Sequence, residues 1–186
     1  MRLNLQKAFA AALCASLLAL AGCESWPYYN YSAKEIRTNP VAMSDSPTYL
    51  VLKAEPQFST FVSLIDAAGM ENTLRSRGTA YTIFAPTNAA FAKIPAATLD
   101  MLKKKPNREK LRNLLFAHMV LYTLTPTELA AAPTVSMADQ AHFVITADHG
   151  KINSIGSATV VSPPMIASNG TIYGINQVLM PPSAGF

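Results

Sequence analysis

The sequence predicts one domain of the α+β class, and three observations lead to that expectation. Apolar residues recur at helical spacing mainly before residue 120 and fall in short strand-like runs after it, a division typical of α+β folds with a largely antiparallel sheet system. The 186 residues, half of them hydrophobic, suffice for one core. Residues 81–85 are apolar on both faces, which indicates a strand that is covered on both sides.

The first residues have the pattern of an export signal. Arg2 and Lys7 precede an apolar run over residues 8–21, which is too short for an ordinary transmembrane helix and suits a secretory signal core. The run ends in Leu-Ala-Gly-Cys, which resembles a bacterial lipobox and predicts removal of residues 1–22 and acylation of Cys23. The alternative is a signal peptide cleaved nearby, with Cys23 incidental.

Lipidation at Cys23 bears on location and on chemistry. Acyl chains would hold the protein on a membrane. An aspartate directly after the cysteine would resemble an inner-membrane retention signal. The residue at this position is Glu24, which favours the outer membrane of a bacterial cell envelope. With Cys14 in the removed segment, the mature domain keeps no thiol for disulfides, catalysis or metal binding. Of fifteen basic residues Arg2 and Lys7 are lost, so thirteen remain against eleven acidic ones, a net charge of about +2. The precursor's pI of 9.1 is therefore no sign of nucleic-acid binding.

A linker is expected to precede the domain. Residues 23–46 contain two prolines and no sustained apolar period, which is typical of a flexible segment. The domain is expected at residues 47–182, followed by a tail at 183–186. Trp26 and the neighbouring tyrosines leave three alternatives open: membrane-interface anchors, packing on the domain, or no role.

The first helices of the domain follow from apolar spacing. A short helix is expected at residues 49–54. The residues Phe58, Phe61, Val62 and Ile65 then lie at i, i+3, i+4 and i+7, which predicts an amphipathic helix with Gly69 as its C-terminal cap. Another helical turn is expected at residues 71–75.

The segment YTIFAPTNAAFAKIP, residues 81–95, predicts a strand, a sharp corner and a helix. Pro86 favours an extended residue before it and ends the strand. Thr87 or Asn88 offers a side-chain oxygen to cap the helix, and Phe91 and Ile94 share one face of it.

Two longer helices are expected next. Thr98 predicts the cap of a helix that runs to residue 105, where three consecutive lysines form either a solvated helix end or a patch for an anionic surface. In the following helix the spacing of Leu111, Leu114, Leu115 and His118 places His118 on the buried face.

The remainder is mostly strand-like. A strand is expected at residues 119–124, and Thr-Pro-Thr-Glu at 125–128 predicts a capping box that starts a short helix. Strands are expected at 141–147, 152–153 and 158–162, with a hairpin turn at 148–151. Asn169-Gly170 predicts the turn between strands at 165–167 and 171–179.

Two of these segments, and a third between them, resemble the fasciclin (FAS1) domain family. The segment at residues 81–95 resembles the first family signature, NGTIYGINQVLMPP at residues 169–182 resembles the second, and residues 111–120 resemble the segment between them. The resemblance implies a wedge-like β-sandwich with several short helices packed against it. The signature residues are Thr82, Phe84, Ala85, Pro86, Thr87, Asn88, Phe91, Asn169, Gly170 and Ile175.

No catalytic or metal-binding pattern is present in the sequence, so no enzyme activity, cofactor or metal is expected. Hydrolase elbows, zinc-protease motifs and nucleotide-binding glycine loops are all missing. His142 and His149 with Asp139 or Asp148 lack a third well-spaced ligand. Asn169-Gly170-Thr171 fits a glycosylation sequon, which a bacterial lipobox makes incidental.

His118 is the candidate binding residue, although a structural, hydrogen-bonded role is the favoured interpretation of a histidine on an apolar helix face. In the FAS1 resemblance it matches the histidine of a tyrosine-histidine motif that is associated with integrin binding in animal members. The residue before it here is Ala117. That difference argues against an adhesive use and leaves a packing role intact.

Two functions are therefore expected. The first is a lipid-anchored, non-catalytic adhesion or interaction module that binds an envelope or extracellular protein or polymer. The alternative is a periplasmic carrier of a small apolar ligand, which requires an apolar pocket beside the helices. The sequence identifies neither the partner nor the oligomeric state.

Overall fold

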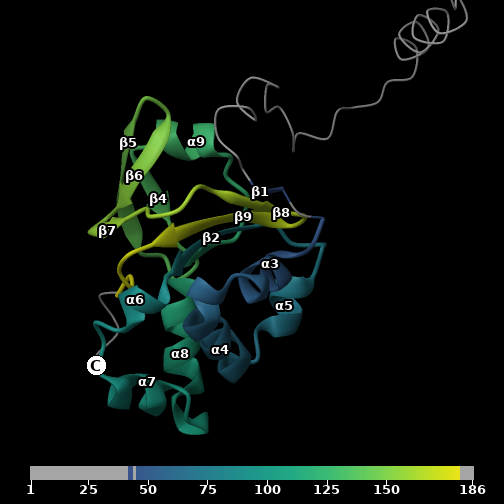
Figure 1. The fold of residues 1–186 in the computed structure, drawn as a ribbon, viewed down its shortest axis with the longest axis vertical. Coiled ribbons are helices and arrows are strands. Elements are labelled where there is room, and N and C mark those ends of the chain that lie inside the picture. Colours follow the sequence, from purple (N-terminus) through teal and green to yellow (C-terminus); the bar gives the residue numbers. More distant parts are fainter. Residues whose placement is uncertain (1–41, 44, 181–186) are drawn as a thin grey trace, which may run out of the picture. The chain divides into compact units, whose positions relative to one another are not determined.

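The computed structural model describes residues 42–43 and 45–180 (Figure 1). The expected signal peptide, Cys23, most of the expected linker and the tail lie outside the described residues. The described part holds helices in its first half and most of its strands in its second half. The predicted α+β class is confirmed.

A five-stranded sheet forms the middle layer, in the order β1-β8-β9-β2-β3. Its central pair, β2 (Tyr81–Pro86) and β9 (Gly170–Ile175), is buried along its whole length and runs parallel, with Tyr81 opposite Gly170 and Pro86 opposite Ile175. The other strands are β1 (Ala42–Met43), β8 (Met165–Ala167) and β3 (Met119–Val120). The expectation of a largely antiparallel system therefore fails at the centre of this sheet.

A second, four-stranded sheet is antiparallel throughout, in the order β4-β5-β6-β7. Its strands are β4 (Thr134–Ser136), β5 (His142–Asp148), β6 (Lys151–Ile155) and β7 (Ala158–Thr159). One bridge, between Val160 and Ile175, links its end to the first sheet.

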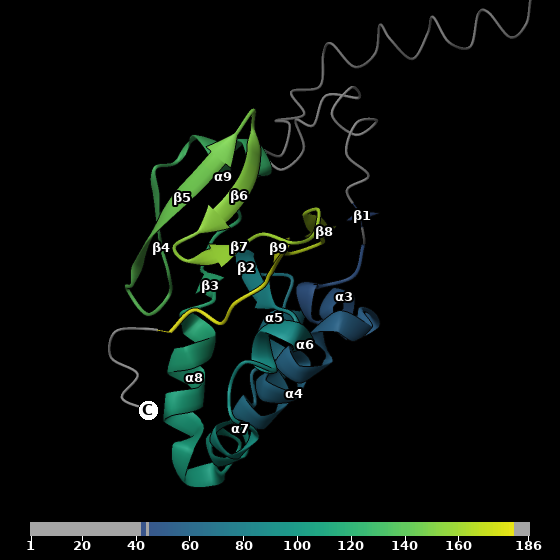
Figure 2. The same ribbon diagram turned by 60° about the vertical axis from the view of Figure 1, so that its left-hand side comes forward.

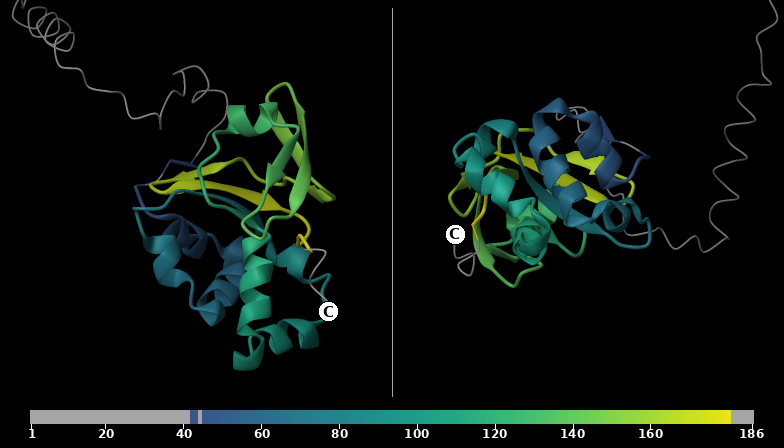
Figure 3. Two further views of the ribbon diagram at one scale, coloured as in Figure 1. Left: turned by 180° about the vertical axis from the view of Figure 1, so that it is seen from behind. Right: turned by 90° about the horizontal axis from the view of Figure 1, so that it is seen from below.

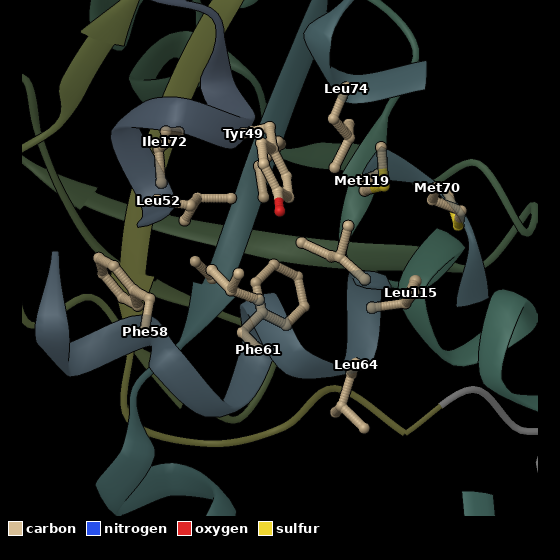
Figure 4. Close-up of a cluster of buried hydrophobic side chains, with 14 of the residues drawn as sticks. Tyr49, Leu52, Phe58, Phe61, Leu64, Met70, Leu74, Leu115, Met119 and Ile172 are labelled. Atoms are coloured by element: carbon tan, nitrogen blue, oxygen red, sulfur yellow. The ribbon is translucent and has the colours of Figure 1, made fainter. Parts of the chain in front are cut away.

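The two sheets and the helices form layers. In Figures 1 and 3 the first helices lie on one side of β2 and β9, and the four-stranded sheet with α9 lies on the other side. Successive side chains of β2 point to opposite faces of the sheet. Tyr81 and Ile83 therefore pack in the core under the helices, and Phe84 packs in the core between the two sheets. Figure 4 shows the first core, where Tyr49, Phe61 and Leu115 converge from different helices.

Most predicted helices are present. They comprise α3 (Thr48–Ala54), α4 (Ser59–Ala68), α5 (Glu71–Arg75), α6 (Asn88–Phe91), α7 (Ala96–Leu102), α8 (Arg108–Phe116) and α9 (Pro126–Ala131), with 3₁₀ turns η1 (Pro56–Phe58) and η2 (Lys105–Asn107). Gly69 ends α4 in the left-handed conformation (φ 67°), and Thr125 and Glu128 form the predicted capping box of α9.

Several elements differ from the predictions, and the strands expected to end at residues 162 and 179 end at Thr159 and Ile175. Helix α7 starts at Ala96, directly after Pro95, and not at a Thr98 cap. The strand expected at 119–124 is only two residues long, since the chain leaves the sheet after Val120. Strand β4 was not predicted. Strand β1 lies within the expected linker and pairs in parallel with β8, so the folded region begins before residue 47.

Candidate functional site

The candidate binding residue His118 lies in the core, just after the end of α8. Its side chain is 1% exposed, and the ring lies 5.9 Å from that of Phe61. Nδ1 lies 2.7 Å from the Leu114 carbonyl oxygen, and the Leu179 N–H donates to Nε2 at 2.8 Å. Because Nε2 accepts, Nδ1 carries the proton and donates to Leu114, so the imidazole is neutral.

The surroundings of His118 favour the neutral form. Burial lowers the pKa of His118 from 6.5 to about 4, and the hydrogen bond to the Leu114 carbonyl opposes this only in part. The ring thus joins the end of α8 to the segment after β9. The predicted burial of His118 is confirmed.

A partner cannot reach this histidine from solvent in the observed conformation. Ala117, which occupies the tyrosine position of the motif, is also fully buried. The Ala117-His118 pair therefore offers no contact surface. The residue-level role supported here for His118 is a hydrogen-bonded connection inside the core.

Asn88, in the first signature, serves a helix other than its own. Its Oδ1 accepts from the Thr60 N–H at 3.0 Å, and its Nδ2 donates to the Pro56 carbonyl oxygen at 2.9 Å and to Ser59 Oγ at 3.0 Å. Pro56 belongs to the 3₁₀ turn η1, and Ser59 and Thr60 to the start of α4, whose first N–H groups have no partner within the helix. The cap of α6 itself is Thr87, which accepts from Ala90 N–H.

Asn169, in the second signature, has the same kind of role. It is 3% exposed; its Oδ1 accepts from the Thr48 N–H at the start of α3, at 2.7 Å. Its Nδ2 donates to the carbonyl oxygens of Leu74 and Ser76 at the end of α5, at 3.0 and 2.8 Å. The side chain therefore joins two helices to the turn before β9, and its buried amide nitrogen is not accessible to a glycosyltransferase. The predicted turn is Ser168-Asn169, and Gly170 already belongs to β9.

The other signature residues hold the central strands. Thr82 Oγ1 donates to the Tyr122 carbonyl oxygen and accepts from Leu124 N–H. Phe84 stacks on Tyr173 at 5.6 Å between ring centres. Four further signature residues are buried, namely Ala85, Pro86, Phe91 and Ile175. At Gly170 the close approach of the Tyr81 carbonyl leaves no space for a Cβ atom.

The remaining histidines do not assemble a metal site. His142 Nδ1 bonds Ser136 Oγ at 2.8 Å, and His149 Nδ1 bonds its neighbour Asp148 at 2.6 Å. Within residues 42–43 and 45–180, no group of three or more His, Cys, Asp or Glu side chains could hold a metal ion.

The most distinctive charged surface is the corner where α7 meets α8, which we call the basic corner (residues 103–112). Six of these ten residues are basic and one is acidic; the basic ones are Lys103, Lys104, Lys105, Arg108, Lys110 and Arg112. Sequence reasoning found only the three consecutive lysines. It missed the others, although a count of charges over this ten-residue stretch of sequence would have found them.

The arginines and the lysines of the basic corner differ in their partners. Arg108 and Arg112 both donate through Nε to the Ala68 carbonyl oxygen at the end of α4, at 3.0 and 3.2 Å, where a cation complements the helix dipole. Glu109 is 4.0 Å from Arg112. The four lysines are exposed, and none has an ion pair with a described residue. In Figures 1 and 2 the corner lies at the end of the domain away from β1.

The comparisons with known proteins agree with this architecture. The model of the Fasciclin domain matches residues 56–181, more than half of the chain. The chain belongs to the fasciclin-domain family. A solved FAS1 domain pair from the insect cell adhesion molecule fasciclin I aligns with a TM-score of 0.66 at 14% identity, over 76% of this chain and 53% of that one. The predicted FAS1 fold is confirmed, and the chain spans about half of that domain pair.

Bacterial relatives of this fasciclin domain are closer in sequence. Protein sll1483 of Synechocystis sp. is 38% identical over 125 residues, which cover 67% of this chain and 68% of that protein. Immunogenic protein MPB70 of Mycobacterium bovis is 32% identical over 146 residues, covering 76% and 72%. Cell surface glycolipoprotein MPB83 of the same species is 30% identical over 146 residues, covering 76% and 63%.

Two hollows of this fasciclin domain bear on the carrier hypothesis. One, of about 650 Å³, lies beside α6 and α7 and is an open depression lined in part by Phe91, Ile94 and Leu99. The other, of about 180 Å³, is more enclosed and lies among strands, at the junction of the two sheets. Under the helices, the core is filled by large side chains (Figure 4).

The helices of the fasciclin domain are short. None within the described residues has the length and apolar character needed to cross a membrane.

Proposed function

We propose that this fasciclin domain is a non-catalytic interaction module, held by a lipid at Cys23 on the outer membrane of a bacterial cell, and that its basic corner binds an acidic polysaccharide of the envelope or the extracellular matrix. The observation that carries the proposal is the clustering of four exposed lysines, none in an ion pair with a described residue, on one corner of a mature chain whose net charge is only about +2. A repeating anionic polymer complements such a surface.

The names of relatives support an extracytoplasmic location. MPB83 is described as a cell surface glycolipoprotein, and MPB70 as an immunogenic protein. A lipid at Cys23 followed by a linker would tether the domain at its β1 end. The basic corner at the other end of the domain would then be free to meet a polymer.

The carrier alternative receives less support. A bound small molecule usually loses most of its surface to the protein, whereas the depression beside α6 and α7 is open to solvent. The more enclosed hollow, of about 180 Å³, lies among strands and not beside the helices, where large side chains fill the core.

The test is binding of alginate, a carboxylated polysaccharide, to the mature chain carrying Cys23→Ser, which prevents acylation. We expect saturable binding that weakens as salt rises, because the charges are exposed. Replacing Lys103, Lys104 and Lys105 together by glutamine should weaken it about tenfold, since three exposed charge contacts contribute about 0.5 kcal/mol each.

The matched control removes three cations elsewhere, through Lys53→Gln, Arg77→Gln and Lys151→Gln. It has the same net charge as the corner variant and should bind alginate nearly as well as the parent. An equal loss of alginate binding in both variants would show that binding depends on net charge and not on the basic corner. Absence of binding at low salt, or equal binding to neutral dextran, would refute the proposal.

A further inference from the structure

The more enclosed hollow lies where the two sheets meet, and the proposed function does not use it. Its walls come from the start of β6, from residues 160–164 between β7 and β8, from Tyr173 of β9 and from Pro126 of α9. These segments are distant in sequence. The fold itself therefore creates the cleft, which we call the junction cleft.

The walls of the junction cleft are rigid and mostly apolar. Three prolines contribute to them, Pro126, Pro163 and Pro164, and their fixed φ angles reduce the freedom of the backbone. Ile152 is buried, and Tyr173 is held by stacking on Phe84. A preformed cleft of this kind costs little ordering energy when a ligand binds.

One charged residue, Lys151, is among those that line the junction cleft. It is exposed and has no ion pair with any described residue. Asp148, its partner in the β5–β6 register, is bonded to His149 and is not among the lining residues. The cleft therefore combines mainly apolar side chains with the Ser162 hydroxyl and a single cationic group.

The size of the junction cleft limits its ligand. Its volume is about 180 Å³, and an apolar cavity of about 150 Å³ accommodates benzene. We propose that the junction cleft binds a small anionic ligand with an apolar body the size of one aromatic ring, of the aromatic carboxylate class, with the carboxylate at Lys151. This inference is independent of polysaccharide binding at the basic corner.

The test uses benzoate as the probe and ¹H–¹⁵N spectra of the mature chain carrying Cys23→Ser. We expect saturable shifts at the amides of Gly150, Lys151, Val161 and Ser162. Benzyl alcohol, which keeps the ring and lacks the charge, should bind at least threefold more weakly. Lys151→Gln should weaken benzoate binding to a similar extent, as expected for an exposed charge contact, while Lys53→Gln, at an exposed lysine outside the cleft and the basic corner, should not.

A second variant separates blocking from misfolding. Val161 is 51% exposed at the cleft, and Val161→Trp should fill the space and abolish the shifts. The control is Val144→Trp, since Val144 is 61% exposed on β5 outside the cleft. If Val161→Trp unfolds the protein, the comparison of benzoate binding between the parent and Lys151→Gln tests the inference. Shifts that do not saturate, that survive Val161→Trp in a folded protein, or that are equal for benzyl alcohol would overturn the inference.

Discussion

Three polar side chains, His118, Asn88 and Asn169, connect elements that are far apart in the sequence. Each satisfies backbone groups left over at helix ends or in the segment after β9. The sequence predicted the burial of His118, because helical spacing determines which face a residue occupies. It did not predict the asparagine roles, since their partners lie 28 to 121 residues away and no local pattern identifies such contacts.

The buried neutral His118 predicts acid sensitivity. Its pKa is about 4 in the folded state and about 6.5 when unfolded, so between these values the unfolded chain binds more protons and stability falls as pH falls. From pH 7 to pH 5 the free energy of unfolding should drop by about 2 kcal/mol from this group. Urea titrations at both pH values measure the drop.

His118→Ala provides the comparison. At pH 7 it should cost about 1–3 kcal/mol, because Leu114 and Leu179 lose a buried partner. The further loss between pH 7 and pH 5 should then be smaller by about 2 kcal/mol than in the parent. An equal acid-induced loss in parent and variant would contradict a neutral, buried His118.

Gly170 should tolerate no side chain. A Cβ atom there would meet the Tyr81 carbonyl oxygen within the central strand pair, and backbone cannot move away as a flexible side chain can. We expect Gly170→Ala to destabilise the domain by about 1–3 kcal/mol. Gly78→Ala, where the nearest atom is 3.7 Å away, should cost little in the same thermal unfolding assay. Equal melting temperatures for the two variants would refute the close approach.

At the scale of elements, prediction succeeded where local chemistry is strong. Helices α4, α8 and α9 have clear apolar spacing or a capping box. It failed where tertiary contacts decide. Strand β4 has three residues, two of them exposed, and exists through its pairing with β5. Strand β3 ends at Val120, although the residues that follow are strand-like in sequence.

The start of α4 should depend on Asn88, a residue outside that helix. Asn88→Ala removes the acceptor for Thr60 N–H and is expected to cost about 1–3 kcal/mol. Asn88→Asp keeps the acceptor and adds a charge that suits a helix N-terminus, so it should cost less. Chemical denaturation of both variants measures the order.

The control is Asn113→Ala on the exposed face of α8, which should change stability by no more than about 0.5 kcal/mol. A Thr60 amide that remains protected from hydrogen exchange in Asn88→Ala would show that Asn88 does not cap α4.

At the scale of the whole molecule, the fold class and the family followed from the sequence, and the proposed functional surface followed only in part. The two signature segments contain β2 and β9, which pair along six residues; this parallel contact was missed because a crossover of more than eighty residues separates the strands. In the basic corner the three consecutive lysines were recognised in the sequence, whereas the contacts of Arg108 and Arg112 with the Ala68 carbonyl oxygen were not. Signature residues serve packing, whereas the proposed partner surface lies outside both signatures.

The measurement that tests the central claim most directly is a ¹H–¹⁵N chemical-shift map of the mature chain, carrying Cys23→Ser, during titration with short alginate oligomers at low salt. We predict that the largest shifts fall on residues 103–112, and that they shrink as salt screens the exposed lysines. Shifts concentrated instead on the outer face of the β4–β7 sheet, or no saturable shifts, would contradict a polysaccharide-binding role for the basic corner.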